Sequence, residues 1–180
     1  MSIALDFTGK VVAISGGSKG VAPGIVERFL EAGATVEHYT RTAPDAPIGS
    51  AAFTAVDVRD AEQVAAWING IAERHGRLDV LVNNVGGSPF SARRPSPGTA
   101  VYGAAKASLE NLTRSLRAEW APRIRVNAIS SGLVDTESAD GHYGTPEQLA
   151  GVAATIPRGR LDVMSRQVVE SADGCGSDCG

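Results

Sequence analysis

The chain has 180 residues, with 17 Lys and Arg against 20 Asp and Glu, so its formal net charge is −3. This length, with 43% hydrophobic and 21% charged residues, is typical of one globular domain and excludes a disordered chain. The mildly acidic balance argues against a nucleic-acid-binding protein, and no apolar run is long enough to predict a membrane span. The first residues do not have the pattern of a signal peptide, so we expect a cytoplasmic protein.

Cys175 and Cys179 are the only two cysteines of the sequence, and both lie near its end. Their C-x3-C spacing has no neighbouring His or second cysteine pair, which a zinc site would need. We therefore expect neither a metal site nor a disulfide framework.

Short apolar runs alternate along the chain with longer segments of helical periodicity. The predicted strands are Val11–Ile14, Thr35–Tyr39, Ala52–Val56, Leu78–Val82 and Ile124–Ile129. The predicted helices cover residues 21–32, 60–76 and 99–120, and a short helix begins at residue 145. Strands that alternate with helices predict an α/β fold with a parallel sheet and right-handed crossovers. Residues 161–180 lose this periodicity, and we expect them to form a disordered tail.

Several residues mark where the predicted helices begin and end. Gly33 follows the first helix as its C′ residue, and Asp60 with Gln63 can form an Asx version of a capping box. Thr145 and Gln148 open the last helix, with a proline at N1 between them. The apolar residues of the long helix share one side and are predicted to be buried: Leu109, Leu112, Leu116 and Trp120.

The second strand is unusually polar for a parallel sheet. It contains Glu37 and His38, whereas a strand buried on both faces is normally apolar. Either side chain, buried without a partner, would cost on the order of several kcal/mol.

A glycine-rich loop, Ser15-Gly-Gly-Ser-Lys-Gly-Val-Ala22, joins the first strand to the first helix. Open α/β sheets bind ligands at the carboxyl ends of their strands, and the N-terminus of a helix favours a phosphate. The loop therefore predicts a phosphate site that includes Gly16, Ser18, Lys19 and Gly20. A glycine-rich turn without a ligand is the alternative.

Four further motifs follow this loop in order. They are Asp57-Val58, Asn83-Asn-Val-Gly86, Tyr102-x3-Lys106, and Arg125-Val-Asn-Ala-Ile129 followed by Gly132 and Thr136. Together with Ser15, Gly16, Gly20 and Ala22, this set resembles the motifs of the short-chain dehydrogenase/reductase family. The resemblance covers residues 8 to 161.

This resemblance implies a Rossmann-like, doubly wound parallel sheet, here reduced to about five strands in the order 3-2-1-4 plus a last strand. The sheet would form one dinucleotide-binding domain over residues 1–160. The implied activity is hydride transfer between a nicotinamide cofactor and an alcohol or ketone. By resemblance, Tyr102 is the general acid/base and Lys106 supports it, and the two lie one helical turn apart. The implied cofactor-binding residues are Gly16, Ser18, Lys19, Gly20, Arg41, Asp57, Val58, Asn84, Gly86 and Thr136.

The cations around the loop favour NADP over NAD as the cofactor. Lys19 and Arg41 could pair with the 2′-phosphate of NADP, and Thr40 stands where NAD-preferring relatives place an acidic residue. Glu37 is a rival acidic residue, but it lies in the middle of the strand.

The segment Gly87–Val101 is shorter than the family pattern requires. It leaves no room for the helix and strand that carry the family's catalytic Asn and Ser, and Pro89 stands at the place of that Ser, between Ser88 and Ser91. Weak or absent catalysis in a dinucleotide-binding protein is therefore the alternative function. A homo-oligomer is possible, although one of the helices through which relatives associate is missing.

Overall fold

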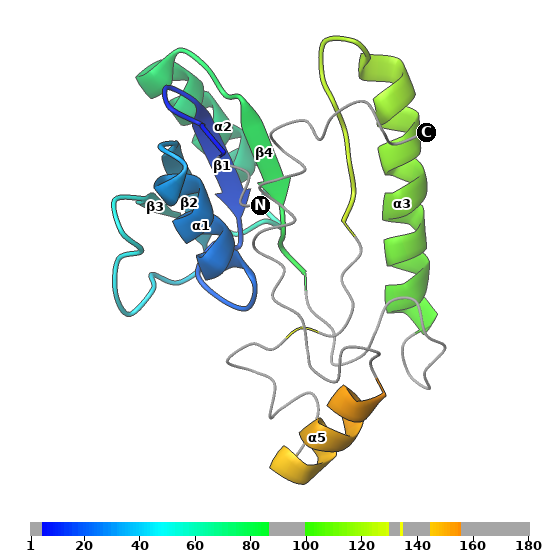
Figure 1. The fold of residues 1–180 in the computed structure, drawn as a ribbon. Helices are drawn as coiled ribbons and strands as arrows, with labels where there is room; N and C mark the ends of the chain where they lie inside the picture. Colours follow the sequence, from blue (N-terminus) through cyan, green and yellow to red (C-terminus); the bar gives the residue numbers. More distant parts are fainter. Residues whose placement is uncertain (1–4, 87–99, 130–133, 135–144, 156–180) are drawn as a thin grey trace. The chain divides into compact units, whose positions relative to one another are not determined.

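The structure is a computed structural model that describes residues 5–86, 100–129, 134 and 145–155 (Figure 1). The chain divides into two compact units, residues 1–86 with 163–180 and residues 87–162. The single domain expected over residues 1–160 stays a prediction, and the expected tail lies outside the described residues.

The first unit is built on a parallel sheet of four strands. These are β1 (Val11–Ser15), β2 (Thr35–Thr40), β3 (Ala52–Ala55) and β4 (Val80–Asn83), in the order β3-β2-β1-β4. In the middle of the sheet, Val12 pairs with Val36 of β2 and Val80 of β4. The predicted strand order 3-2-1-4 is confirmed.

Two helices cover opposite faces of this sheet, α1 (Ala22–Glu31) and α2 (Ala61–His75), as Figure 1 shows. Alternate residues of a strand point to opposite faces, so β1 and β2 each contribute to two clusters. The cluster under α1 contains Val12, Ile14, Val36, Ile25, Val26 and Phe29. The cluster under α2 contains Val11, Ala13, Tyr39, Val56, Trp67 and Ile71.

The end of α1 and the start of α2 follow the local signals of the sequence. Gly33 has φ +85°, and the N–H groups of Gly33 and Ala34 bond to the carbonyls of Leu30 and Phe29, which forms a Schellman motif. Asp60 accepts bonds from the N–H groups of Glu62 (3.0 Å) and Gln63 (3.1 Å). The reciprocal bond of a capping box is absent among the described contacts, because Gln63 Oε1 accepts from the N–H of Asp57 instead.

Glu37 is buried against α2, and its charge is paired there. Arg74 donates to both carboxylate oxygens, at 3.2 and 3.0 Å, and His75 Nε2 lies 2.8 Å from Oε1. The Glu37 side chain is 3% exposed, whereas Arg74 is half exposed. The last turn of α2 thus supplies the partners that a buried glutamate needs.

His38 is buried on the other face of β2, and its Nδ1 has no hydrogen-bond partner among the described residues. Its ring lies 5.4 Å from that of Phe53. Burial lowers the pKa of His38, partly opposed by the charge of Glu37. Burial therefore favours the neutral imidazole over the charged form at this position.

The second unit contains two described helices, α3 (Ala100–Trp120) and α5 (Pro146–Ala154). The capping box at α5 is confirmed, since Thr145 N–H donates to Gln148 Oε1 (2.9 Å) and Gln148 N–H to Thr145 Oγ1 (3.4 Å). The start of α3 predicted at Thr99 lies outside the described residues. No helix in the described ranges is long and apolar enough to cross a membrane.

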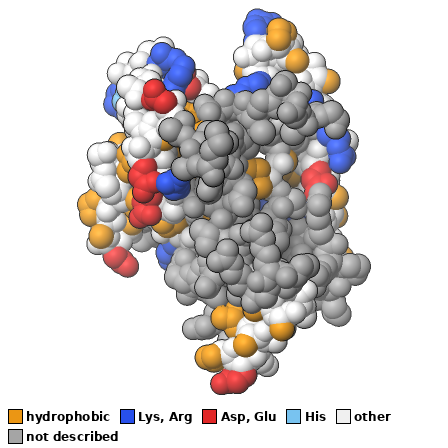
Figure 2. Space-filling model, viewed as in Figure 1, with side chains coloured by type: hydrophobic (Ala, Val, Ile, Leu, Met, Phe, Trp, Pro, Cys, Tyr) orange, Lys and Arg blue, Asp and Glu red, His pale blue; other side chains and the backbone are white. Residues whose placement is uncertain are grey.

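Two predictions for the second unit are wrong. Residues 124–129 form no strand, and the N–H of Ile124 bonds back to the carbonyl of Trp120 (3.0 Å) rather than to a neighbouring strand. No residue of α3 is buried, and the expected buried side is exposed at Leu109 (46%), Leu112 (49%) and Trp120 (44%). Hydrophobic side chains are visible on the surface of this part of the chain in Figure 2. The periodicity of apolar residues shows which of them share one side of a helix. Burial also requires another element to pack against that side.

Loss of the Arg74 side chain should destabilise the first unit. We expect Arg74→Met to lower the free energy of unfolding by about 1–3 kcal/mol, because a buried carboxylate loses two bonds. Urea unfolding followed by the fluorescence of buried Trp67 measures this change, in a Trp120→Phe background that leaves one tryptophan. The control Arg28→Met removes only an exposed pair with Glu31 and should cost at most about 0.5 kcal/mol. Equal effects of the two variants would contradict this prediction.

Burial of neutral His38 predicts that the first unit loses stability in mild acid. The folded pKa lies below the unfolded value of 6.5, so the unfolded chain binds the extra proton as the pH falls below about 6.5. Stability should therefore be highest above that pH and decline below it, until the pH reaches the folded pKa. The same urea unfolding, repeated from pH 8 to pH 5, should show a smaller decline for His38→Leu. Parallel pH profiles for the two proteins would contradict the assignment.

Candidate functional site

The predicted cofactor residues of the first unit lie together at one edge of the sheet. All four strands are parallel, so their carboxyl ends meet at this edge. Each strand is followed there by a predicted group: residues 16–20, Arg41, residues 57–58 and residues 84–86. The remaining predicted cofactor residue, Thr136, lies outside the described residues.

The glycine loop is tied to the end of β2. The N–H groups of Gly16 and Gly17 both donate to the carbonyl of Tyr39, at 2.9 and 3.1 Å. Gly16 and Gly20 have φ values of +69° and +66°, in the left-handed region that glycine adopts readily. A Cβ on Gly17 would lie 2.7 Å from Nδ1 of His38, so glycine is required for this close approach.

The N-terminus of α1 follows this loop directly. Its N-cap residue, Val21, makes no side-chain capping bond. The first N–H groups of a helix have no partners within the helix, and they form a favourable site for an anion. Exposed Lys19 adds a positive charge beside this helix end.

Ser15 joins the end of β1 to the end of β4. Its buried hydroxyl accepts bonds from the N–H groups of Asn84 (2.9 Å) and Val85 (3.2 Å). The side-chain amide of Asn84 donates to the carbonyl of Gly16 at 3.3 Å. The sequence identified Ser15 only as a motif position, and these bonds across 69 and 70 residues of sequence were not predictable from it.

The residues at the end of β2 bring hydroxyl groups and a cation to the same edge. Thr40 Oγ1 lies 3.4 Å from Ser18 Oγ and donates to the carbonyl of Thr42 at 2.6 Å. Arg41 is exposed, and its positive charge contributes to lowering the pKa of Asp57. The tip of β2 therefore carries Thr40 and a cation rather than an acidic side chain.

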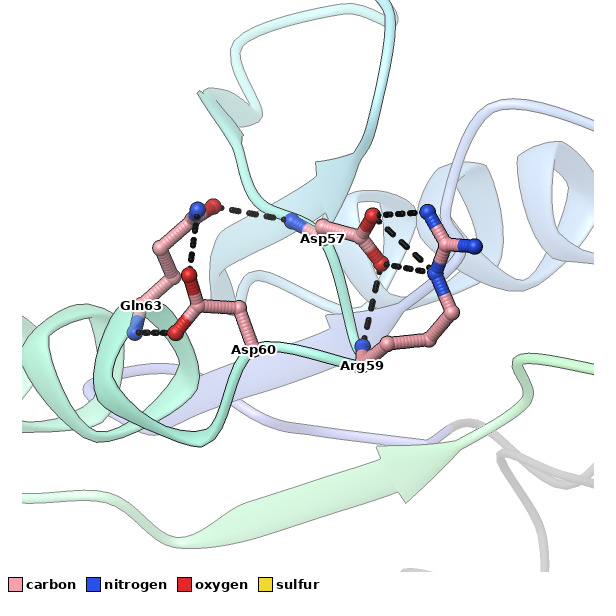
Figure 3. A network of polar contacts seen from close by, with 4 residues as sticks. All are labelled: Asp57, Arg59, Asp60 and Gln63. Carbon is pink, nitrogen blue, oxygen red and sulfur yellow. Dashed lines mark hydrogen bonds and ion pairs between the residues drawn. The ribbon is translucent and has the colours of Figure 1, made fainter.

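The residues after β3 form the polar network drawn in Figure 3. Arg59 bonds to both carboxylate oxygens of Asp57, and these bonds are the main reason that the pKa of Asp57 is far below its usual range. Gln63 donates to Asp60 Oδ2 at 2.9 Å and accepts from the N–H of Asp57 at 3.0 Å. Val58 is 45% exposed beside this network. Sequence reasoning missed Arg59, although the Asp-x-Arg spacing was a usable signal, and it gave Gln63 a capping role only.

Tyr102 and Lys106 lie in the second unit, on α3. The ammonium of Lys106 is 5.5 Å from the centroid of the Tyr102 ring, and both side chains are half-buried. The spacing of four residues on a helix accounts for this contact. Ser88, Pro89 and Ser91, where the family's catalytic Ser was sought, lie outside the described residues. No three His, Cys, Asp or Glu side chains gather as a metal site within the described parts of the chain.

Comparisons with known proteins decide the family. The model described as "short chain dehydrogenase" matches residues 10–94, and the one described as "Enoyl-(Acyl carrier protein) reductase" matches residues 88–172. An uncharacterized oxidoreductase of Methylorubrum extorquens is 30% identical over 210 residues, which cover 84% of each chain. The chain belongs to the short-chain dehydrogenase/reductase family. It is therefore related to oxidoreductases along nearly all of its length.

One further relative and one solved structure bear on the length and the fold of this family member. The 3-oxoacyl-[acyl-carrier-protein] reductase of Chlamydia pneumoniae is 27% identical over 238 residues, covering 92% of this chain and 96% of that protein. The Pseudomonas aeruginosa RhlG/NADP active-site complex is a similar structure, with a TM-score of 0.80 at 22% identity. The match covers 96% of this chain and 91% of that one. This second likeness supports the Rossmann-like fold.

The matches also bear on two expectations from the sequence: that this chain is shorter than the family pattern, and that the resemblance ends at residue 161. The alignment to the Chlamydia pneumoniae protein is longer than this chain, so that relative has segments that this chain lacks. The family match extends to residue 172, so the expected end of the resemblance at residue 161 was too early.

Proposed function

We propose that the chain is an NADP-dependent oxidoreductase that transfers a hydride between the nicotinamide and an alcohol or ketone. The observation that carries the proposal is the convergence of the glycine loop, the tip of β2 and Asp57 at one edge of the sheet. The Pseudomonas aeruginosa structure with this fold is a complex with NADP. Gly16, Ser18, Lys19, Gly20, Arg41, Asp57, Val58, Asn84 and Gly86 are the described residues proposed to bind the cofactor.

The residues of this edge fit a dinucleotide. A Cβ on Gly16 would lie 3.0 Å from the Val85 side chain, so glycine keeps the loop close to the end of β4. The N-terminus of α1 offers backbone donors and the positive end of the helix dipole to a pyrophosphate. Val58 offers apolar surface and Asp57 an acceptor to the base.

The charges at the edge favour NADP over NAD. An NAD site at this position places an acidic side chain on the ribose hydroxyls. Here the tip of β2 is Thr40, whose hydroxyl bonds to the carbonyl of Thr42, and the next residue is the exposed cation Arg41. Lys19 in the loop is a second exposed cation. Both can pair with a 2′-phosphate.

Tyr102 and Lys106 are proposed to perform the proton transfer. In reduction, the phenol of Tyr102 donates its proton to the carbonyl oxygen, and in oxidation it accepts the proton of the alcohol. Lys106, whose ammonium is 5.5 Å from the ring centroid, is proposed to offset the negative charge left on the phenolate oxygen. The bound cofactor supplies or accepts the hydride. The name of the Chlamydia pneumoniae relative makes a 3-oxoacyl compound a sensible first substrate to test.

The second candidate function is dinucleotide binding without efficient catalysis. The observation that favours it is the length of the alignment to the Chlamydia pneumoniae reductase, which contains segments that this chain lacks. The short segment of residues 87–101 is where the family's catalytic Ser would otherwise lie. Loss of one preorganised donor typically lowers the rate about 10²- to 10³-fold.

Cofactor binding tests the first half of the proposal. NADPH at 100 times its Kd should stabilise the chain by about 2.7 kcal/mol in a thermal-shift titration. Arg41→Met should weaken NADPH binding about tenfold, because a charge-assisted contact with the phosphate is lost, and change NADH binding much less. The control Arg77→Met changes a cation near Asp79 at the opposite edge and should leave both affinities as they are. Tighter binding of NADH than of NADPH by the unaltered chain would contradict the choice of NADP.

Turnover distinguishes the two candidate functions. We expect NADPH oxidation with a panel of ketones that includes an acetoacetyl thioester, and a 10²- to 10⁴-fold lower kcat/KM for Tyr102→Phe because the proton donor is lost. The variant should bind NADPH with unchanged affinity. NADPH binding without turnover on any member of the panel would instead support the binding protein.

A further inference from the structure

One residue, Arg59, holds the carboxylate of Asp57 (Figure 3). Oδ1 accepts from the backbone N–H and from Nε of Arg59, both at 3.0 Å. Oδ2 accepts from Nη2 at 2.5 Å and shares Nε at 3.1 Å. The Arg59 side chain is 75% exposed and that of Asp57 26%, so the pair lies at the surface of the site.

These bonds leave the carboxylate with little freedom. An ionised carboxylate has about four acceptor positions, and three N–H groups of Arg59 already point at them. The fourth acceptor position is on Oδ2, whose principal donor is Nη2 of Arg59. The N–H of Asp57 bonds to Gln63, and the carbonyl of Asp57 accepts from the N–H of Asp60 at 2.9 Å. Asp57 therefore presents one fixed acceptor to a ligand.

The surroundings of this acceptor suit a flat ring that carries an amino group. Val58, the next residue, exposes apolar surface. A shallow depression lies over Asp57, Arg59, Asp60, Ala61, Glu62 and Gln63, and most of these side chains are polar. A single acceptor at the rim of such a site pairs with one N–H donor. A carbonyl oxygen at the same place would be repelled by the carboxylate.

We propose that Arg59 is a positioning residue that sets base specificity, because it orients Asp57 so that the site selects a 6-aminopurine over a 6-oxopurine. The inference rests on the proposed NADP site and adds a role for a residue outside the family motifs. Arg59 acts through Asp57 and does not itself need to touch the base.

The first unit contains a matched pair that serves as a control. Arg77 bonds to both oxygens of Asp79 with the same two-residue spacing in reverse order. There, Asp79 Oδ2 also accepts from the N–H of Val11, at the start of β1 and hence at the opposite edge of the sheet. Arg77 therefore positions a carboxylate that holds the fold together rather than one that faces the proposed ligand.

The orientation of Asp57 can be tested without any cofactor. The Arg59 bonds lower the pKa of Asp57, so Arg59→Met should raise this pKa toward the ordinary value, as measured by NMR titration of the carboxyl group. Arg77→Met should leave the pKa of Asp57 unchanged. An unchanged pKa in Arg59→Met would overturn the proposal at its first step.

The specificity is tested by the ratio of two affinities, for NADPH and for its hypoxanthine analogue, in which a carbonyl oxygen replaces the amino group of adenine. We expect the unaltered chain and Arg77→Met to bind NADPH about tenfold more tightly than the analogue. In Arg59→Met the ratio should fall to within about threefold, since Asp57 can rotate. Arg59→Lys keeps the charge but not the paired donors, so it should not restore the ratio.

Three outcomes would overturn the inference. Arg59→Met could keep the preference of about tenfold for NADPH over the analogue, or Arg59→Lys could restore that preference in full. The third outcome is tighter NADPH binding once the Arg59 side chain is removed. The last result would make Arg59 a competitor of the base. Each of these leaves NADPH binding intact and so spares the proposed function. Absence of NADPH binding by the unaltered chain would overturn both. The fluorescence of buried Trp67 verifies that the variants are folded.

Discussion

The parallel alignment of four strands is the constraint on which the candidate site depends. Since all four strands run in one direction, each delivers the residues that follow it to the same edge of the sheet. A few bonds then lock these loops together. Tyr39 accepts from two glycines of the loop after β1, and Ser15 accepts from two residues after β4. Backbone hydrogen bonds thus fix the position of the loops, and the loops carry the side chains of the candidate site.

Strand β2 shows how this sheet accommodates buried polar residues. Successive side chains point to opposite faces, so Glu37 and His38 meet different surroundings. Glu37 finds Arg74 and His75 on α2, whereas His38 lies against Phe53 and under Gly17 without a partner for Nδ1 among the described residues. The ring of His38 occupies space that a side chain at position 17 would need. The polar strand and the glycine loop therefore constrain each other.

The second unit illustrates the difference between local and non-local information. Tyr102 and Lys106 contact each other because any helix brings residues four apart together. The apolar side of the same helix is exposed at Leu109 and Leu112, because a helical period does not provide a covering element. For the same reason the segment Ile124–Ile129, predicted as a strand, does not form one. A strand needs a neighbour to accept its hydrogen bonds, and the sequence pattern cannot specify one.

The amino-acid sequence by itself determined the features encoded within a few residues of one another. These include the strands and caps of the first unit, the glycine loop, and the spacing of Tyr102 and Lys106. The order of the motifs along the chain also indicated the family. Only the tertiary structure decided which distant groups meet, such as Glu37 with Arg74, 37 residues later, or Ser15 with Asn84. It also showed that Arg59 holds Asp57, although the two are close in sequence. The physical reason is that periodicity and capping depend on local backbone geometry, whereas a buried charge or a fixed carboxylate depends on how the chain folds around it.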